Sequence, residues 1–571
     1  MKKLVFNFLL IISFSGIPLS AQYQPKDISR ADVKKANQWV EQIYNSLSQD
    51  EKLGQLFIVA LYTNKDDNHI NQVRNIVTND KIGGLILMQD DASREINLVN
   101  EFQQKSKIPL MIGMDAEWGI YQRINTAHKF PWAMTLGAIQ DKELIYQMAA
   151  KIAEDCKRMG VNWDFAPVVD VNTNPSNPII GNRSFGSEVS NVTKSALSYA
   201  NGLQDNNILA AIKHFPGHGD TNTDSHLDLP VVSHSLERLN KIEIAPFKAL
   251  MNKGIGGVMV AHLYVPSLES GKGIPASVSK KIVTDLLKDK LGYKGLIITD
   301  ALNMGAVANK YKPGELDALA FKAGNDIMLF SQGVAEGKKL IQKAIDKGEI
   351  SQDRVEESVK KILLTKYYLG LNQYTPKNPE NVNFDINNKS HTKLVQNLYS
   401  NALTLLKDEK KLLPLSSNTT YYYIPLEEAP YQTFANQLNV SSKVIVKKAS
   451  EINTIPANST VIVGFHKDNS TAYKPYKISA ESKKVLADLA KNQNIILNVF
   501  GSAYALKDID ISKVSTVLVS YENNDDSMTA TADAFNGKTK ISGRLPVLIN
   551  DTLKPGMGID LKVSHKINCI K

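Results

Sequence analysis

Eight short apolar runs alternate with longer amphipathic stretches between about residues 50 and 375, and this rhythm limits the folds open to the chain. Strands of a parallel sheet that helices cover on both faces read as continuous apolar segments. Eight such strands, each with room for a helix before the next, predict an α/β fold of the (β/α)8 TIM-like barrel type, with a doubly wound sheet as the alternative. The runs are LFIVAL (56–61), GGLILM (83–88), PLMIGM (109–114), VNWDFAPVVD (161–170), LAAIKHF (209–215), GVMVAHL (257–263), GLIITD (295–300) and NDIMLF (325–330).

Polar side chains stand at the ends of several of these runs. They are Asp115, Lys213, His214, His262 and Asp300. Any one of them alone reads as a strand-end residue that faces solvent. In a barrel, however, the carboxyl ends of all strands meet at one face, where catalytic residues collect. Together the five positions therefore predict a functional site at that face.

The texture of the chain changes after residue 375. Residues 376–392 are polar and rich in Pro and Asn, which is typical of a linker between domains. From 393 to 571 apolar runs such as TVIVGF and TVLVSYE alternate with helical segments such as SAESKKVLADLAKN. We therefore expect a catalytic barrel over residues 30–375 and a second domain, an αβα sandwich, over 393–571.

Residues 1–21 have the layout of a secretory signal peptide: Lys2 and Lys3, an apolar run from Leu4 to Ile12, and a small-residue pattern that ends at Ala21. No Cys follows the apolar run, and no later stretch approaches the roughly 18 apolar residues that span a bilayer. We therefore expect an exported protein, periplasmic or secreted, without a stable membrane anchor.

Composition narrows the classes of partner. The 571 residues are 43% hydrophobic and 22% charged, with a formal net charge of +9. The positive charge is dispersed, and no basic run with interleaved aromatic residues indicates nucleic-acid binding. Cys156 and Cys569 are the two cysteines, so no disulfide framework is expected.

The stretch KHFPGHGDTNTDSH, residues 213–226, is dense in histidine and raises the question of a metal site. His214 and His218 are four apart, the spacing that places two zinc ligands on one face of a helix. Pro216 and Gly217 lie between them and disfavour a helix, so the spacing loses its meaning. We therefore expect no metal here.

The end of the same stretch suggests acid–base chemistry. Asp224 and His226 are two apart in a turn-rich segment, where the carboxylate can hold one ring nitrogen and leave the other for a substrate. A surface loop with an adjacent Asp and His is an equally good reading of this stretch alone. Asp300 shifts the balance, because a carboxylate at a strand end together with a separate proton donor is the minimal equipment of a retaining glycosidase.

Several motifs, in order along residues 50–370, resemble glycoside hydrolase family 3, and more narrowly its β-N-acetylglucosaminidase branch of peptidoglycan recycling. A weaker similarity continues into ALTLLKDEKKLLPL and SGRLPVLI of the second domain. The motifs are KHFPGHGDTNTDSH with LDLP, PLMIGMDAEWG with YQR, FPWAMTLGA, NRSFG and GLIITDALNMGAV.

The resemblance implies a role for each matching residue. Asp300 matches the nucleophile, His226 the general acid/base and Asp224 its partner. The residues that match groups holding the sugar ring are Asp115, Arg123, Arg183, Lys213 and His214. No cofactor is implied, and the partner is a carbohydrate that contains β-linked N-acetylglucosamine.

Two departures from the family pattern bear on the site. The family commonly has Glu-Gly-Gly after the Asp of the third strand, whereas Ala116, Glu117 and Trp118 precede Gly119 here, so Trp118 is a candidate to narrow or cover the subsite. In the β-glucosidase branch the acid/base is a Glu of the second domain. The DSH segment makes such a Glu unnecessary, which leaves the second domain a structural or cleft-closing role.

The expected function is therefore an exported, retaining exo-β-N-acetylhexosaminidase. The alternatives are a β-glucosidase or β-xylosidase of the same family, a phosphorylase, and a cell-wall-binding module without activity. Of the other histidines, His262 is expected to line the pocket or to bond a strand-end neighbour. His128, His391 and His565 are expected at the surface.

Overall fold

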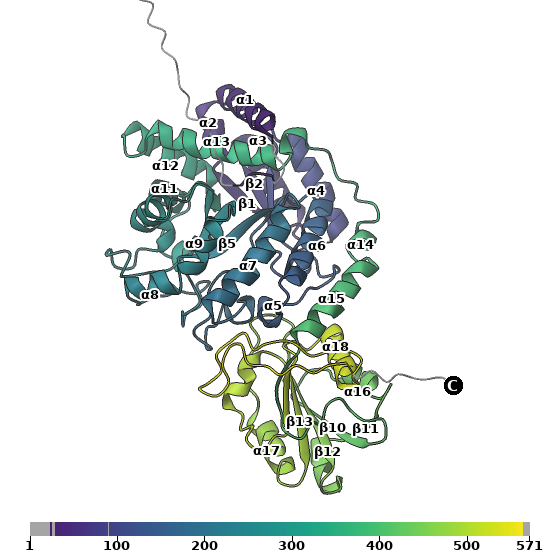
Figure 1. The fold of residues 1–571 in the computed structure, drawn as a ribbon. Coiled ribbons are helices and arrows are strands. Elements are labelled where there is room, and N and C mark those ends of the chain that lie inside the picture. The colour runs from purple at the N-terminus through teal and green to yellow at the C-terminus, as the bar shows by residue number, and fades with distance from the viewer. Residues whose placement is uncertain (1–22, 26–28, 90, 564–571) are drawn as a thin grey trace, which may run out of the picture.

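The structure is a computed structural model that describes residues 23–25, 29–89 and 91–563. The signal peptide predicted over residues 1–21, together with His565 and Cys569, lies outside the described residues. Figure 1 shows two α/β bodies: the earlier part of the chain forms the larger one, and the later part forms a smaller one below it. The fold class predicted from the sequence is confirmed.

The larger body is a barrel of eight parallel strands in the order β7-β6-β5-β4-β3-β2-β1-β8. An isolated parallel bridge between Ile298 and Ile327 joins the last strands and brings the sheet round on itself. Each predicted apolar run contributes one strand. The strands are β1 Phe57–Leu61, β2 Gly84–Leu87, β3 Met111–Met114, β4 Trp163–Asp164, β5 Leu209–Phe215, β6 Gly257–Val260, β7 Leu296–Thr299 and β8 Met328–Leu329.

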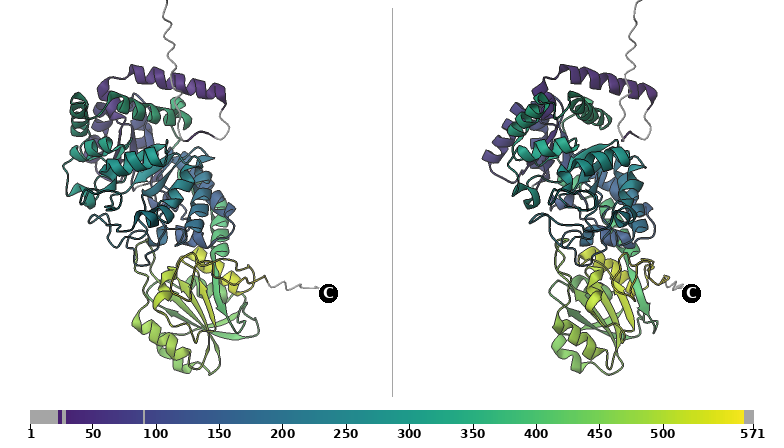
Figure 2. Two further views of the ribbon diagram at one scale, coloured as in Figure 1. Left: turned by 60° about the vertical axis from the view of Figure 1, so that its left-hand side comes forward. Right: turned by 90° about the vertical axis from the view of Figure 1, so that its left-hand side faces the viewer.

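Helices surround the barrel, and each buries an apolar stripe against the strands. Helix α7 shows the pattern, since Val192, Ala196 and Leu203 are buried along one face. The helices are α1 Arg30–Ser46, α2 Gln49–Gly54, α3 Asp67–Asp80, α4 Ala92–Lys105, α5 Ala133–Ala138, α6 Glu143–Met159, α7 Val189–Gln204, α8 Leu236–Lys241, α9 Ala245–Met251, the π-helix η4 Lys281–Lys290, α10 Gly305–Ala308, α11 Glu315–Ala323, α12 Val334–Asp346 and α13 Gln352–Tyr368. Figure 2 shows α1 lying across the end of the barrel remote from the second domain.

The second domain is a six-stranded sheet in the order β11-β10-β12-β13-β14-β9, with helices packed around it. All neighbours pair in parallel except β9, which runs antiparallel to β14 and which the sequence reading had not counted as a strand. Its elements are α15 Lys389–Ala402, β9 Thr404–Asp408, β10 Thr420–Leu426, α16 Gln432–Leu438, β11 Lys443–Val446, β12 Thr460–His466, α17 Ala480–Leu489, β13 Asn494–Phe500, β14 Thr516–Val519 and α18 Asp525–Phe535.

The stretch predicted as a linker, 376–392, lies against the barrel. It contains the short helix α14 (Val382–Asp385) and the start of α15. The Arg158 guanidinium of α6 donates to the Asn378 and Glu380 carbonyls, both at 2.6 Å, and to the Asp385 carboxylate at 2.7 Å. The domain limits drawn from the sequence stay predictions.

A buried glutamate ties the two domains together. Glu522 follows β14 and is fully buried, and its Oε1 accepts hydrogen bonds from the Trp132 backbone N–H at 2.9 Å and from Thr135 Oγ1 at 2.8 Å. The ammonium of Lys129 lies 3.3 Å from its other oxygen. Because a buried carboxylate needs such partners, these contacts fix the second domain on the barrel. Within the described part of the chain, no helix has both the length and the apolar character to cross a membrane.

Candidate active site

A cavity of about 340 Å³ opens at the carboxyl ends of the barrel strands. Its lining includes Tyr62 after β1, Met88 after β2, Asp115 after β3, Asp300 after β7 and Phe330 after β8. Of the predicted site residues, all of which the structure describes, only Asp224 is outside the lining, and it contacts one that is inside. Those that line the cavity are Asp115, Arg123, Arg183, Lys213, His214, His226 and Asp300.

One wall of the cavity is a network of paired charges, which we call the sugar clamp: Asp115, Glu117, Arg123, Arg183 and Lys213. Lys213 Nζ lies 2.8 Å from Asp115 Oδ1 and 2.9 Å from Glu117 Oε1. Arg183 grips Glu117 with two bonds, of 2.9 Å from Nε and 2.7 Å from Nη2. Arg123 Nη2 donates to Asp115 Oδ2 at 2.5 Å. Every charge in the clamp thus has a partner before a ligand arrives.

The clamp carboxylates stay ionised although they are buried. Burial alone would raise the pKa of Glu117, but Arg183 and Lys213 outweigh it and lower the pKa to about 2. The pKa of Asp115 is likewise held well below its usual range, because Lys213 and Arg123 overcome the cost of its burial. The clamp can therefore present charged donors and acceptors to sugar hydroxyls across the neutral pH range.

His214 stands beside the clamp with a fixed ring. Its Nδ1 contacts Asp170 Oδ2 at 2.7 Å, and Arg183 Nη2 lies 3.3 Å from its Nε2. Asp170 is fully buried and also accepts from the His218 backbone N–H at 2.6 Å. This arrangement makes Nδ1 the donor to Asp170, so the ring is held in one orientation toward the cavity.

Asp300 lies at the end of β7 with 9% of its surface exposed. The Ala301 N–H donates to its Oδ1 at 2.8 Å. Burial would raise the pKa of Asp300, but the nearby His214, His262, this N–H and Lys213 together hold the pKa below its ordinary value. A carboxylate that remains ionised, buried and largely free of direct ion pairs is equipped to attack an electrophilic carbon.

The Asp224–His226 pair sits in an irregular loop that follows β5. His226 Nδ1 donates to Asp224 Oδ1 at 2.8 Å, and the His226 backbone N–H donates to the same oxygen at 2.8 Å. The His226 side chain is 57% exposed, and it lines the cavity that contains Asp300. The loop is pinned to α10 by the Gly305 N–H, which donates to the His226 carbonyl at 3.2 Å. Nε2 is thus the ring nitrogen left for a substrate.

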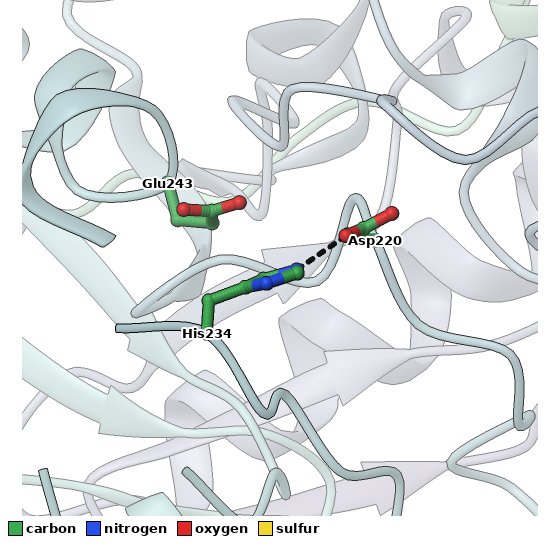
Figure 3. Close-up of side chains that lie close together, drawn as sticks. All are labelled: Asp220, His234 and Glu243. Atoms are coloured by element: carbon green, nitrogen blue, oxygen red, sulfur yellow. Dashed lines mark hydrogen bonds and ion pairs between the residues drawn. The ribbon is translucent and has the colours of Figure 1, made fainter. Parts of the chain in front are cut away.

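The two ends of this loop are tied by a cluster that we call the loop stem: Asp220, His234, Arg238 and Glu243. Figure 3 shows the His234 ring directed at Asp220, with Glu243 beside it. Arg238 Nη2 contacts Asp220 Oδ2 at 3.0 Å and Glu243 Oε1 at 3.3 Å. Ligand atoms of Asp220, His234 and Glu243 lie within 4.8 Å of one another, which would suit a cation. Arg238 already supplies the positive charge between the two carboxylates, so we describe the cluster as an ion-pair staple.

The other histidines are hydrogen-bonded within the protein. His218 is buried, with Nδ1 at 2.7 Å from Thr221 Oγ1 and Nε2 at 3.2 Å from Ser225 Oγ. His262 is buried, with Nδ1 at 2.7 Å from Ser277 Oγ, which matches the strand-end alternative. The surface placement predicted for His391 is wrong, because its Nε2 contacts the Asp155 carboxylate at 3.0 Å with 1% of the residue exposed. His128 is partly buried.

Two lining residues were not singled out by the sequence. Glu117 was treated only as part of a departure from the family pattern, yet it bridges Arg183 and Lys213. Trp118, the candidate to cover the subsite, packs on Trp132 with ring centroids 6.3 Å apart and is not among the described residues that line the cavity. Tyr473 is the other missed residue, and of the described residues in the second domain it alone reaches this lining.

Comparison with known proteins gives a consistent picture. Residues 48–365 match the description "Glycosyl hydrolase family 3 N terminal domain". The chain is 30% identical over 559 residues to "Beta-hexosaminidase A" of Pseudoalteromonas piscicida, which covers 84% of this chain and 91% of that protein. It is 28% identical over 386 residues to "Beta-N-acetylglucosaminidase/beta-glucosidase" of Cellulomonas fimi, covering 66% of this chain and 68% of that one.

A solved structure resembles both domains. It is a glycoside hydrolase family 3 beta-N-acetylglucosaminidase from Paenibacillus sp. str. FPU-7, with a TM-score of 0.72 and 27% sequence identity. The match covers 88% of this chain and 99% of that chain. The similarity therefore extends beyond the barrel to the smaller domain and its placement.

Proposed function

The chain belongs to glycoside hydrolase family 3, and from this premise we propose that it is a retaining exo-β-N-acetylhexosaminidase that is exported and releases terminal N-acetylglucosamine from cell-wall-derived glycans. One observation carries the proposal. The buried carboxylate of Asp300 and the imidazole of His226, whose Nδ1 is engaged by Asp224, line the same cavity. That set provides a nucleophile and a separate proton donor, which retaining hydrolysis requires.

In the first step Asp300 attacks the anomeric carbon and the bond to the leaving oxygen breaks. His226 donates its Nε2 proton to that oxygen, so the aglycone leaves as a neutral alcohol. Asp224 stabilises the imidazolium before transfer and keeps Nδ1 as the nitrogen that retains its proton. The product of this step is a glycosyl ester on Asp300.

In the second step the neutral His226 accepts a proton from water, and the resulting hydroxide equivalent displaces Asp300 from the sugar. Two displacements at one carbon return the original configuration. Because His226 is uncharged after the first step, an anionic acceptor such as phosphate is not repelled. Phosphorolysis is therefore the alternative outcome that an assay must separate from hydrolysis.

The sugar clamp holds the ring during both steps. Its cations and carboxylates face the cavity in fixed positions, so sugar hydroxyls can replace solvent without moving the protein groups. We assign Asp115, Arg123, Arg183, Lys213 and His214 to this role and add Glu117. The names of the relatives support an N-acetylhexosaminide as substrate, and the name of the Cellulomonas protein includes β-glucosidase, so both glycosides should be assayed.

The decisive test is the removal of Asp300. Release of p-nitrophenol from the N-acetyl-β-glucosaminide should vanish in Asp300→Ala and persist in Asp289→Ala, which removes an exposed carboxylate on η4. The p-nitrophenyl β-glucoside and β-xyloside, measured in parallel, decide the substrate. Retained activity in Asp300→Ala would overturn the nucleophile assignment, and no activity on any glycoside would favour a binding module.

Stereochemistry and acceptor need one further measurement. Proton NMR of a fresh reaction should show the β-anomer of N-acetylglucosamine first, because a double displacement retains configuration. The same reaction with phosphate should give the free sugar. N-acetylglucosamine 1-phosphate as the product would mean phosphorolysis, and an initial α-anomer would refute retention.

A further inference from the structure

A second cavity, of about 320 Å³, lies beside the active-site cavity. One wall is the barrel segment 175–182 and the other is the second-domain segment 472–477, which follows β12. Ile179 and Tyr473 line both cavities, so the two hollows share a wall. A ligand that extends out of the active site past Tyr473 would enter this second cavity.

The walls of the second cavity are joined by hydrogen bonds between the domains. Asn182 Nδ2 donates to the Ala472 carbonyl at 3.3 Å, and the Tyr476 hydroxyl donates to the Pro175 carbonyl at 3.1 Å. Asn172 Nδ2 donates to the Tyr504 hydroxyl at 2.7 Å. These bonds hold the second-domain wall in place, so the cavity is built into the fold rather than left between two loose surfaces.

Aromatic rings form much of the surface. Tyr476 and Tyr504 pack with ring centroids 5.8 Å apart, and their hydroxyls are engaged by the barrel. Tyr473 is 49% exposed at the boundary between the cavities. Rings with an apolar body and a polar tip suit a ligand that has both C–H faces and hydroxyl groups, and such surfaces are typical of small-molecule sites. A sugar ring has this character.

The charge of the cavity is one-sided. Lys474 and Lys477 line it, and none of its described lining residues is a carboxylate. Lys474 is paired with Asp468 at 2.8 Å. Lys477 is exposed, and it makes no ion pair with any residue that the structure describes. One cation therefore remains available to an anionic group on a ligand.

From these observations we propose that the second cavity is the subsite for the aglycone, and that it takes a sugar ring carrying a carboxylate. Tyr473 packs on the ring next to the cleaved bond, and Lys477 binds the carboxylate. This inference rests on the proposed function and deepens it, because it names the group on the far side of the scissile linkage. It also gives the second domain a direct part in substrate selection.

Two disaccharides that differ in one acidic group provide the test. We would measure kcat/KM for N-acetylglucosaminyl-β-1,4-N-acetylmuramic acid and for neutral chitobiose with the wild type, Lys477→Met and Lys484→Met. Lys484 is an exposed lysine of α17 outside the cavity and is the matched control. Loss of one charge-assisted contact should lower the acidic-to-neutral ratio of kcat/KM about tenfold in Lys477→Met and leave it unchanged in Lys484→Met.

Tyr473→Ala should lower kcat/KM for both disaccharides alike, since stacking does not depend on the carboxylate. An unchanged acidic-to-neutral ratio in Lys477→Met would overturn the proposal. So would a Tyr473→Ala variant that cleaves both disaccharides as well as the wild type does.

Binding without turnover separates this proposal from the proposed function. If the wild type hydrolyses neither disaccharide nor the aryl glycoside, the proposed function fails. Calorimetric titration of N-acetylmuramic acid, with N-acetylglucosamine present to fill the active-site cavity, then decides the subsite independently. Binding to the wild type that weakens in Lys477→Met supports the subsite, and the absence of binding to the wild type refutes it.

Discussion

The sugar clamp and the Asp224–His226 pair line opposite extremes of one active site. Arg183 and Glu117 of the clamp each have side chains that are 7% exposed, whereas the His226 side chain is 57% exposed. Clamp partners are far apart in the sequence: Lys213 and Asp115 are separated by 98 positions, while Asp224 and His226 are separated by two. One half of the site is built by the tertiary fold and the other by a short segment.

This difference follows from what each half does. Buried charges that hold a sugar must be paired in advance, because an unpaired buried charge is costly and a mobile one would not select an orientation. A group that exchanges protons with a leaving oxygen and then with water must face solvent. The clamp should therefore couple binding to stability, and the pair should affect chemistry alone.

The largest effect is expected from His226→Ala. General acid catalysis contributes about 10²–10⁴-fold, and its loss matters most when the leaving group is basic. We predict a loss of this size for the disaccharide and a much smaller one for the p-nitrophenyl glycoside, with an unchanged thermal unfolding midpoint because the side chain is exposed. Steady-state kinetics on both substrates and a thermal melt measure all three quantities.

Asp224→Asn is the companion variant, since it keeps an oxygen near Nδ1 but removes the charge. It should show the same dependence on the leaving group with a smaller loss. An equal loss in His226→Ala on both substrates would contradict the acid role, and a lowered melting temperature would contradict the separation of chemistry from stability.

Breaking the clamp at Glu117 should have the opposite signature. In Glu117→Ala, Arg183 and Lys213 lose a buried carboxylate that contacts both, and removal of one partner of a buried ion pair costs about 3–5 kcal/mol. We predict a lower free energy of unfolding together with lost affinity for N-acetylglucosamine. Denaturant melts and calorimetric binding test the two parts.

The matched control for that variant is Glu409→Ala, which removes an exposed carboxylate paired with Lys407. An exposed pair contributes about 0–1 kcal/mol, so this variant should unfold like the wild type. If Glu117→Ala were as stable as Glu409→Ala, the clamp would not be the prepaid structural network described above.

The fold was predictable where burial leaves a local mark. Barrel strands are covered on both faces, so β5 is already legible as LAAIKHF. The run over residues 161–170 is also apolar, but only Trp163–Asp164 forms β4. Pro167 has no N–H to donate to a ladder, which limits the strand. Strand β9 went unseen because it carries the charged Lys407 and Asp408, and its partner β14 lies over 100 residues away.

The site was predictable to the same extent. Asp224, His226 and Asp300 belong to motifs that are compact in the sequence, so they could be found without coordinates. Glu117 could not be given a role, because its partners Arg183 and Lys213 are brought to it by other strands and loops. Tyr473 carries no local signal at all, since its place at the cavity depends on how one domain docks on the other.

The loop stem supplies the smallest predicted effect and the sharpest test of how local the catalytic pair is. His234 and Asp220 enclose the segment that carries Asp224 and His226, so their hydrogen bond fixes where that segment leaves and rejoins the barrel. We predict that His234→Ala lowers kcat about tenfold, or about 1.4 kcal/mol in the activation free energy, with little change in KM because the clamp is intact.

His234→Gln should restore part of kcat, because its amide nitrogen can donate to Asp220 as Nε2 does. A merely structural role would lower the unfolding midpoint and leave the kcat of the folded enzyme unchanged, so the ratio of kcat loss to KM change is the informative quantity. A chelator should not reproduce the variant, since Arg238 already contacts both carboxylates of the stem. If His234→Ala turned over like the wild type, the short Asp224–His226 segment would position itself, and the proton-transfer half of the site would be fully local.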